Sequence, residues 1–353
     1  MNKKIISFIF IVIISIVAVI FTYNNDFMYK DTIMKITNIK TIKEDVNYNT
    51  LGIKEKHYDK ELTGIIVNGK NKGSKKTIKY EETYSSIVTD KYRVNDKVFI
   101  KNGNIEDLKR DYYVVSLIVI SMIFLYLIGK FRGLLAIISA IFNTIIFYFG
   151  ISLYSRGVNL LFLVLIESIM FTIISIYLSC GRNEKSKSTI ISVFISVIFL
   201  LIMSFIIIKS TNYKGINFNE ISFLTIPPEA VILPEFLIGS LGAIMDVAIT
   251  MSSSISELIE KDNKIKYEAL KKSSKEIGKD IMSTMINVLF FTYLSSGLPR
   301  FVLALRNGYS LSNYITDNFS LELSRFLIGS IGIVITIPIA FYVSCKIFKR
   351  GDA

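Results

Sequence analysis

Long apolar segments alternate with short polar connections along most of the chain. Each segment is close to the ~20 residues that an α-helix needs to cross the hydrocarbon core of a bilayer. The pattern predicts eight membrane-spanning helices, at Ile5–Phe21, Tyr113–Ile128, Leu134–Tyr154, Leu160–Leu178, Thr189–Ile208, Phe236–Ser256, Ile281–Leu303 and Phe326–Phe348. The second span is the shortest, and helix tilt or flanking side chains that reach the interface accommodate its length.

Residues 24–110, between the first two spans, follow a different pattern. Apolar and polar residues alternate on both sides of a turn in ELTGIIVNGKNKGSKKTIKYEE, and VNDKVFIKNG repeats the alternation. A period of two with turn residues between the runs predicts antiparallel strands. Four to six short strands in about 85 residues predict a small β-barrel of the OB or SH3-like size class.

The chain is therefore expected to be a polytopic α-helical membrane protein with a small extracytoplasmic β-barrel-like domain between its first two spans. Its expected parts are an N-terminal anchor (1–23), the β-rich domain (24–110), spans two to five (111–209), an outer loop (210–235) and a core with spans six to eight (236–353). The anchor is expected to stay uncleaved, because no A-x-A-like site follows it.

The net charge of +12 comes mostly from alternate connections between spans and from a basic outer domain. Basic residues follow the second, fourth, sixth and eighth spans, at Lys130, Arg132, Arg182, Lys185, Lys187, seven lysines between Lys261 and Lys279, and Lys346 to Arg350. The positive-inside rule then places both termini in the cytoplasm and residues 24–110 outside a bacterial plasma membrane. We interpret the charge as a topology signal, so no nucleic-acid partner is expected.

Residues for enzymatic or metal chemistry are scarce. His57 is the only histidine, which argues against a His-based metal site or proton relay. Cys180 and Cys345 both fall near the predicted cytoplasmic ends of spans, so the outer domain has no disulfide. No phosphate loop, zinc-ligand cluster or nucleophile–base set is visible. We therefore expect neither a cofactor nor an enzymatic activity.

Asp246 lies in the middle of the sixth span. A carboxylate at the centre of a membrane helix costs about 2.5–3.5 kcal/mol on insertion scales and is by default a candidate functional group. Small and polar residues recur at three- and four-residue steps on the same helix face, at Gly239, Gly242, Thr250 and Ser253. The seventh span has a similar face with Asp280, Thr284, Asn287 and Ser295. The short connection predicts that the two helices are antiparallel neighbours.

An alternative is that these groups only stabilise packing. Asn287 would then join two helices, and Asp246 would be a structural carboxyl with a partner. FLIGSLG in the sixth span recurs as FLIGSIG in the eighth, which predicts close-packing notches at Gly239, Gly242, Gly329 and Gly332. Pro338 predicts a kink. Glu167 and Asn143 are further intramembrane polar groups, and neither is informative alone.

Three stretches carry a family resemblance: GSLGAIMDVAITMSSSISEL, GKDIMSTMINVLFFTYLSSGLP and LELSRFLIGSIGIVITIPIAF. They resemble the YibE/F family of bacterial membrane proteins, and the outer domain resembles that of the longer members. The family-like positions are Gly242, Asp246, Ser253, Glu257, Gly278, Asp280, Asn287, Pro299, Glu322, Arg325, Gly332 and Pro338. Val288 departs from the pattern, since a hydroxyl residue is expected there. The resemblance implies no substrate or activity.

Two classes of function remain in competition. The first is a secondary transporter or exporter, in which Asp246 couples a proton or cation to the movement of an unknown small solute or ion. The second is a non-transporting accessory, sensor or assembly protein whose outer domain binds an envelope polymer or a partner. The lipid bilayer is a partner in both, and a homo-oligomer is compatible with both.

Overall fold

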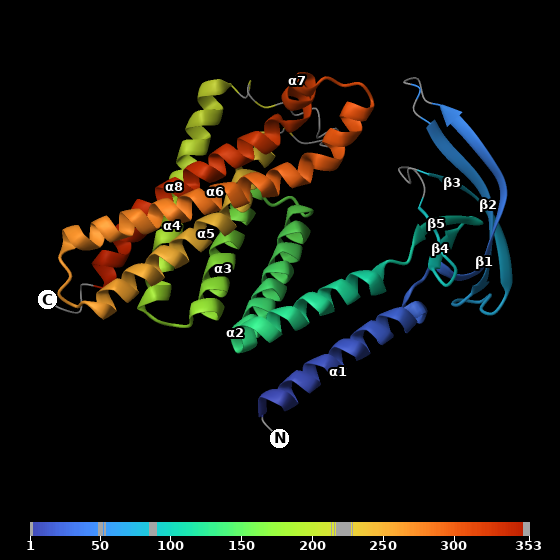
Figure 1. Ribbon diagram of the computed structural model, residues 1–353, viewed down its shortest axis with the longest axis horizontal. Helices are drawn as coiled ribbons and strands as arrows, with labels where there is room; N and C mark the ends of the chain where they lie inside the picture. Colours follow the sequence, from blue (N-terminus) through green and yellow to red (C-terminus); the bar gives the residue numbers. More distant parts are fainter. Residues whose placement is uncertain are drawn as a thin grey trace. The chain divides into compact units, whose positions relative to one another are not determined.

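The computed structural model describes residues 3–48, 52, 54–84, 90–212, 214, 216, 227 and 229–348. The chain divides into two compact units, Met1–Gly133 and Leu134–Ala353. Each unit is described by itself (Figure 1).

The first unit combines two apolar helices with a β-sheet. Helix α1 (Lys3–Asn24) continues into the short 3-10 helix η1 (Asn25–Met28), and helix α2 begins at Asp111 after the last strand. The strands between them are β1 (Thr32–Tyr48), β2 (Lys54–Ile66), β3 (Lys75–Thr83), β4 (Lys97–Lys101) and β5 (Asn104–Leu108). All pairings are antiparallel, as the alternating pattern predicts.

The predicted β-barrel is wrong. The five strands form an open sheet in the order β3-β2-β1-β4-β5, and no pairing among the described residues joins β3 to β5. The long strands β1 and β2 remain paired as far as Tyr48 and Lys54. The pairing of β1 with β4 ends at Lys35, whereas β3 follows β2 as far as His57. Alternation predicts strands and their buried face, but closure also requires the two edge strands to pair, which no local pattern encodes.

One face of the sheet holds the core of this unit. The fully or nearly buried members are Met34, Ile36, Leu62, Ile78, Tyr92, Val98 and Ile100. They include the alternating residues that the sequence places on one side of the strands. The ring of Tyr92 lies 4.8 Å from that of Tyr80, and burial raises the pKa of the Tyr92 hydroxyl.

Two buried lysines join the sheet to the end of α1. Lys97 Nζ donates to Asp26 Oδ2 at 2.6 Å and to the carbonyl oxygen of Tyr23. Lys109 Nζ donates to the carbonyl oxygen of Thr22 at 2.9 Å and lies 3.4 Å from Asp26 Oδ1. Cations near the C-terminus of a helix interact favourably with its free carbonyl groups. This lysine clamp (Asp26, Lys97 and Lys109) fixes where the anchor enters the domain.

Helix α2 (Asp111–Tyr154) covers two of the predicted spans and is interrupted between them. Lys130 has φ 49° and ψ −125°, which is non-helical. A Cβ at Gly133 would collide with the carbonyl oxygen of Leu125, eight residues earlier. Eight residues of continuous helix would separate these positions by about 12 Å. The chain therefore reverses at Lys130, and the close approach requires glycine at position 133.

The second unit is helical. After the end of α2 it contains α3 (Leu160–Cys180), α4 (Glu184–Thr211), α5 (Glu229–Lys261), α6 (Tyr267–Arg306), α7 (Leu311–Tyr314), the π-helical turn η2 (Ile315–Phe319) and α8 (Ser320–Phe348). Asn159 and Asn183 cap α3 and α4 by accepting hydrogen bonds from Phe162 N and Ser186 N. Helix α8 continues through Pro338 without interruption.

Six helices of the described chain are long and apolar enough to cross a membrane: α2, α3, α4, α5, α6 and α8. A shorter apolar stretch, Val12–Met28, covers the second half of α1 and η1. Every predicted span falls within one of these helices, and α2 contains two of them. The membrane-helix character is confirmed, whereas eight crossings remain a prediction.

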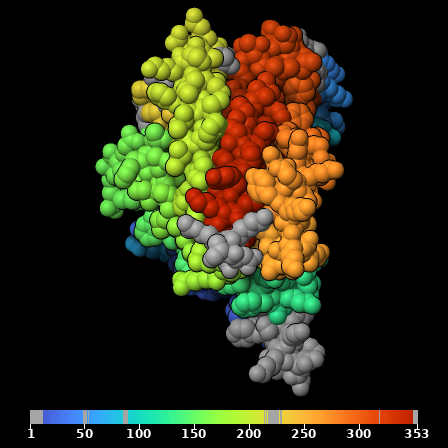
Figure 2. Space-filling model, turned by 90° about the vertical axis from the view of Figure 1, so that its left-hand side faces the viewer, coloured from blue at the N-terminus to red at the C-terminus, as the bar shows by residue number. Residues whose placement is uncertain are grey.

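Helix α8 is the centre of the second unit. Figure 2 shows it between α4 and α6, and residues of α4, α5 and α8 share one apolar core with Val197, Leu241 and Ile328. Ser188, Ser252 and Ser344, one from each of these helices, form a buried hydroxyl cluster with oxygen separations of 2.8 to 3.3 Å. Because small hydroxyl residues allow close approach and bond across helices, this cluster holds α4, α5 and α8 together.

Candidate functional site

Asp246 lies on an open face of α5. Gly242, Asp246 and Thr250 are all exposed, whereas Gly239 and Ser253 are half-buried. The hydroxyl of Thr250 donates to the backbone carbonyl of Asp246 at 2.8 Å, not to its carboxylate. Within the described part of the chain, the carboxylate has no hydrogen bond or salt bridge. The predicted face therefore exists, but nothing in the bundle covers it.

The polar face of α6 is also exposed. Thr284 Oγ1 donates to the carbonyl oxygen of Asp280, and Asn287 Nδ2 donates to that of Ser283, both at 3.0 Å. A shallow groove of about 610 Å³ runs along this face, and the residues lining it are Ser283, Thr284, Asn287, Val288, Phe291, Thr292 and Ser295. All of them belong to α6. The helix thus satisfies its own polar side chains and presents them outward.

Helices α5 and α6 are neighbours, as the short connection predicts. Val247 and Met251 of α5 share an apolar cluster with Met285 and Leu289 of α6. No hydrogen bond among the described residues links Asp246 to Asn287, whose amide is bonded within its own helix. The contact between the two helices is therefore made by apolar side chains, and Asn287 does not join them through its amide.

The four glycines of the repeated motif have different surroundings. A Cβ at Gly239 would collide with the hydroxyl of Tyr293, and one at Gly329 would lie 2.6 Å from Leu289 Cδ2. A Cβ at Gly332 would lie 2.9 Å from Leu200 Cδ1, but one at Gly242 would meet nothing within 4 Å. Three of the four positions are close contacts between helices, whereas Gly242 belongs to the open face of Asp246.

An ion-pair network links α5, α6 and α8 within two turns of their ends. Arg325 Nη2 bonds Glu235 Oε1, and Arg325 Nη1 lies 2.8 Å from Glu322 Oε2. Arg300 Nη2 lies 3.9 Å from Glu322 Oε1. Removing one member of a buried pair leaves an uncompensated charge, so such a network holds its helices in one arrangement.

Sequence reasoning missed this network as a unit. Glu322 and Arg325 are three residues apart on one helix face, and both are family-like positions. The sequence therefore contained an indication of this pair within the network. Glu235 had none, because its pairing with Arg325 joins residues 90 positions apart. Among the described residues, no three His, Cys, Asp or Glu side chains gather as metal ligands.

Asn143 and Glu167 lie on the same interface, between the second half of α2 and α3. Asn143 Nδ2 donates to Ser175 Oγ at 2.9 Å, and Ser139 Oγ bonds the same hydroxyl at 3.1 Å. Glu167 is buried next to Gly150, two turns along α2 from Asn143. Asn143 Oδ1 and Glu167 Oε1 are both buried without a hydrogen-bond partner. Two groups that were uninformative alone therefore belong to one polar interface.

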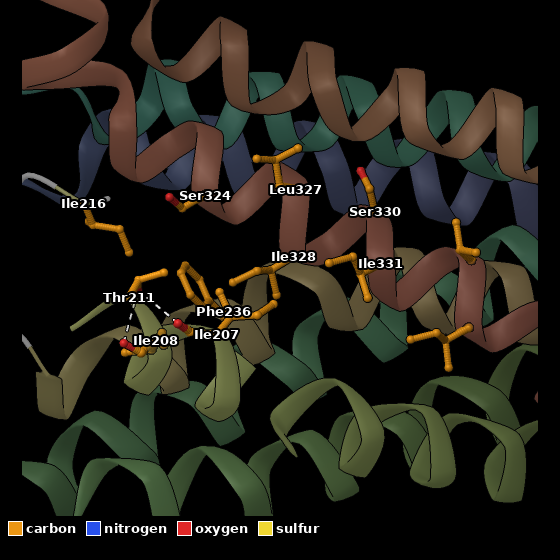
Figure 3. A pocket seen from close by; sticks show the side chains of 12 residues that line it. Ile207, Ile208, Thr211, Ile216, Phe236, Ser324, Leu327, Ile328, Ser330 and Ile331 are labelled. Atoms are coloured by element: carbon orange, nitrogen blue, oxygen red, sulfur yellow. Dashed lines mark hydrogen bonds between the residues drawn. The ribbon is translucent and has the colours of Figure 1, made fainter. Parts of the chain in front are cut away.

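An apolar groove of about 570 Å³ lies between the end of α4, Phe236 of α5 and α8 (Figure 3). Its polar side chains are hydroxyls, and that of Thr211 bonds carbonyl groups of its own helix, at Ile207 and Ile208. None of the described residues that line the groove is ionisable. Contacts there are therefore apolar, and the ionisable chemistry of this unit lies at Asp246, Glu167 and the Arg325 network.

Comparisons with known proteins agree with this architecture. A family model described as YibE/F-like protein matches residues 117–350, and one described as YibE/F family N-terminal domain matches residues 27–113. The first match covers the helices from α2 onward, and the second covers the five-stranded sheet. Neither the comparison with curated proteins nor that with solved structures gave a match. Because the two family models together cover nearly the whole chain, this protein belongs to the YibE/F family.

Proposed function

We propose that the protein is a membrane permease in which Asp246 takes up a proton or another cation during transport of a small solute or ion. One observation supports this proposal above the others. Asp246 is an ionisable group in the middle of an apolar helix, and its carboxylate has no partner among the described residues.

A purely structural carboxyl is expected to have a partner. Buried charges in proteins are paired or hydrogen-bonded, because an unpaired one has a large desolvation cost. Glu235 and Glu322 follow this rule through Arg325. Asp246 is exposed on α5 and has no partner among the described residues, within a helix that is apolar enough to cross a membrane. An unpaired intramembrane carboxylate is instead suited to bind and release a cation, since no permanent counter-ion competes for it.

The neighbours of Asp246 leave access to its carboxylate. Gly242, one turn away, has no side chain, and a Cβ at that position would meet no atom within 4 Å. Thr250 turns its hydroxyl to the backbone. We propose no enzymatic role. The single histidine, His57, lies in β2 and its Nδ1 is 3.1 Å from Glu81 Oε1, so it has a local structural partner.

The test compares Asp246→Asn with Glu257→Gln, a carboxylate on the same helix outside the apolar stretch. Both variants are expressed in a deletion strain, with protein abundance and elution as a single species as controls for folding. We expect Asp246→Asn to fail to complement at any pH, because only the charge is lost, and Glu257→Gln to complement. A complementing Asp246→Asn protein at normal abundance would exclude the coupling role.

A second function is favoured by a cavity in the first unit. It measures about 660 Å³, lies between the end of α1 and the β2–β3 turn, and its charged lining residues are Lys35, Lys72, Lys97 and Asp26. Asp26 is paired with Lys97, so Lys35 and Lys72 are the two cations that suit an anionic ligand, such as an acidic envelope polymer. An accessory or sensor protein would then lose function in a Lys35→Gln, Lys72→Gln double variant and keep it in Asp246→Asn. The permease proposal expects the opposite ranking.

A further inference from the structure

Glu167 faces a small cavity between the second half of α2, α3 and α5. The cavity measures about 180 Å³, and its lining is apolar except for Glu167, Glu235 and the ring of Tyr154. Glu167 is only 6% exposed, and its Oε1 has no hydrogen-bond partner. A buried, unpaired carboxylate oxygen therefore lines an otherwise apolar space.

Gly150 makes room for this carboxylate. A Cβ at position 150 would overlap Glu167 Oε1, so any other residue would displace the side chain. The contact places the carboxyl group against bare backbone of α2. Glycine disfavours a helix interior relative to alanine, so Gly150 does not stabilise α2 and instead leaves the space that the Glu167 carboxylate occupies.

Among the described residues that line the cavity, none is a cation that could neutralise Glu167. The titratable groups that face it are Tyr154 from α2 and Glu235 from α5. Glu235 is itself bound to Arg325, which also pairs with Glu322. An ionised Glu167 would thus be an uncompensated buried charge. Such a group becomes neutral by binding a proton, because the desolvation cost applies to the charged form.

A second cavity lies next to this one, at one end of the bundle. It measures about 430 Å³ and is lined by the turn residues Gly157, Val158 and Asn159. It shares Tyr154, Leu160 and Pro234 with the lining of the Glu167 cavity. This end lies opposite the basic connections, at the other end of α3. The predicted topology makes it the outer side.

We infer that Glu167 is a proton-binding site, separate from Asp246, that exchanges its proton through the cavity beside the 155–159 turn. A metal ion does not fit this site as well, because hard cations take six or more oxygen ligands and only one unpaired carboxylate is present. The inference does not depend on transport through Asp246, and it extends the proposed function by a second titratable group.

The test is labelling of the full-length protein in liposomes with dicyclohexylcarbodiimide, which reacts with protonated carboxyl groups in apolar surroundings. Glu322 is the matched control, because it is as buried as Glu167, at 5% against 6% exposure, but is paired with Arg325. Peptide mass spectrometry should find adducts at Glu167 several-fold above those at Glu322. Once pH exceeds the pKa of the site, the Glu167 signal should fall roughly tenfold per unit.

Three variants sharpen the result. Gly150→Ala should reduce labelling of Glu167, while Gly129→Ala, at a glycine with open surroundings, should not. Asp246→Asn should leave it unchanged, which separates this site from the proposed coupling residue. The inference is overturned if Glu167 stays unlabelled while Asp246 reacts, if Glu322 reacts equally, or if Asp246→Asn abolishes the Glu167 signal.

Discussion

Two glycines at corresponding positions of a repeated motif have different surroundings, so the same residue type serves close helix packing at one position and not at the other. Gly242 ends FLIGSLG in α5, and Gly332 ends FLIGSIG in α8. A Cβ at Gly332 would lie 2.9 Å from Leu200 and 3.0 Å from Ile244, both in the apolar core of the second unit. At Gly242 the same atom would meet nothing within 4 Å.

This difference predicts opposite responses to the same substitution. Gly332→Val should destabilise the protein by about 1–3 kcal/mol, because the added methyl groups force α4 and α5 apart from α8. Gly242→Val should be nearly neutral in stability. Thermal unfolding of both variants in one detergent measures the difference. Equal losses of stability would mean that the face around Gly242 is covered in the same way as the contact at Gly332.

The chemistry of single residues could be predicted only in part. The position of Asp246 within an apolar run was sufficient to single it out, because insertion cost depends on sequence alone. Whether a carboxylate has a partner depends on helices that are distant in sequence. The contact between Gly150 and Glu167 and the pairing of Glu235 with Arg325 both arise from packing, so neither could be inferred from residue spacing.

Among the elements, the lysine clamp explains how a short helix end and a sheet become one body. Asp26 lies between Lys97 and Lys109, which are almost fully buried. The clamp also receives Asp111 at the start of α2, 3.2 Å from Lys109 Nζ. Lys97 in β4 and Lys109 after β5 therefore bind the end of α1, and Lys109 also binds the start of α2.

Asp26→Asn should therefore loosen the domain. Removing one partner of a buried ion pair costs about 3–5 kcal/mol, because the remaining charge is left uncompensated. Hydrogen–deuterium exchange in the full-length protein should become faster across residues 97–108. Asp45→Asn is the control, since Asp45 pairs with Lys43 on the exposed surface, where such pairs contribute about 0–1 kcal/mol. Unchanged exchange in Asp26→Asn would show that the clamp does not hold the sheet.

Elements and their arrangement differ in how far the sequence determines them. Each predicted span lies in a helix, because an apolar run long enough for a bilayer leaves few alternatives to a helix. Leu62, Val98 and Ile100, which lie in the stretches of alternating apolar and polar residues, are on the buried face of the sheet. Closure into a barrel was wrong, because it depends on pairing between β3 and β5, and these edge strands are not paired in the described sheet.

At the scale of the whole second unit, the basic connections gather at one end of the bundle. The hydroxyl cluster of Ser188, Ser252 and Ser344 brings the start of α4 beside the ends of α5 and α8. Lys185 Nζ also lies 3.5 Å from Glu260 Oε1, so the first turn of α4 meets the end of α5. The packing of the helices therefore places at one end of the bundle the connections in which the sequence concentrates its basic residues.

The positive-inside rule assigns that end to the cytoplasm, and this orientation is testable residue by residue. With Cys180 and Cys345 replaced by serine, single cysteines at the exposed positions Ser74 and Asn307 should react with an impermeant thiol reagent added to intact cells. Cysteines at the exposed positions Lys187 and Lys272 should react only after permeabilisation, because the bilayer lies between them and the reagent. Labelling of Lys272→Cys in intact cells would reverse the orientation of the bundle. It would also move the opening of the Glu167 cavity to the cytoplasmic side, so that the proton at Glu167 would exchange with the cell interior and not with the outside.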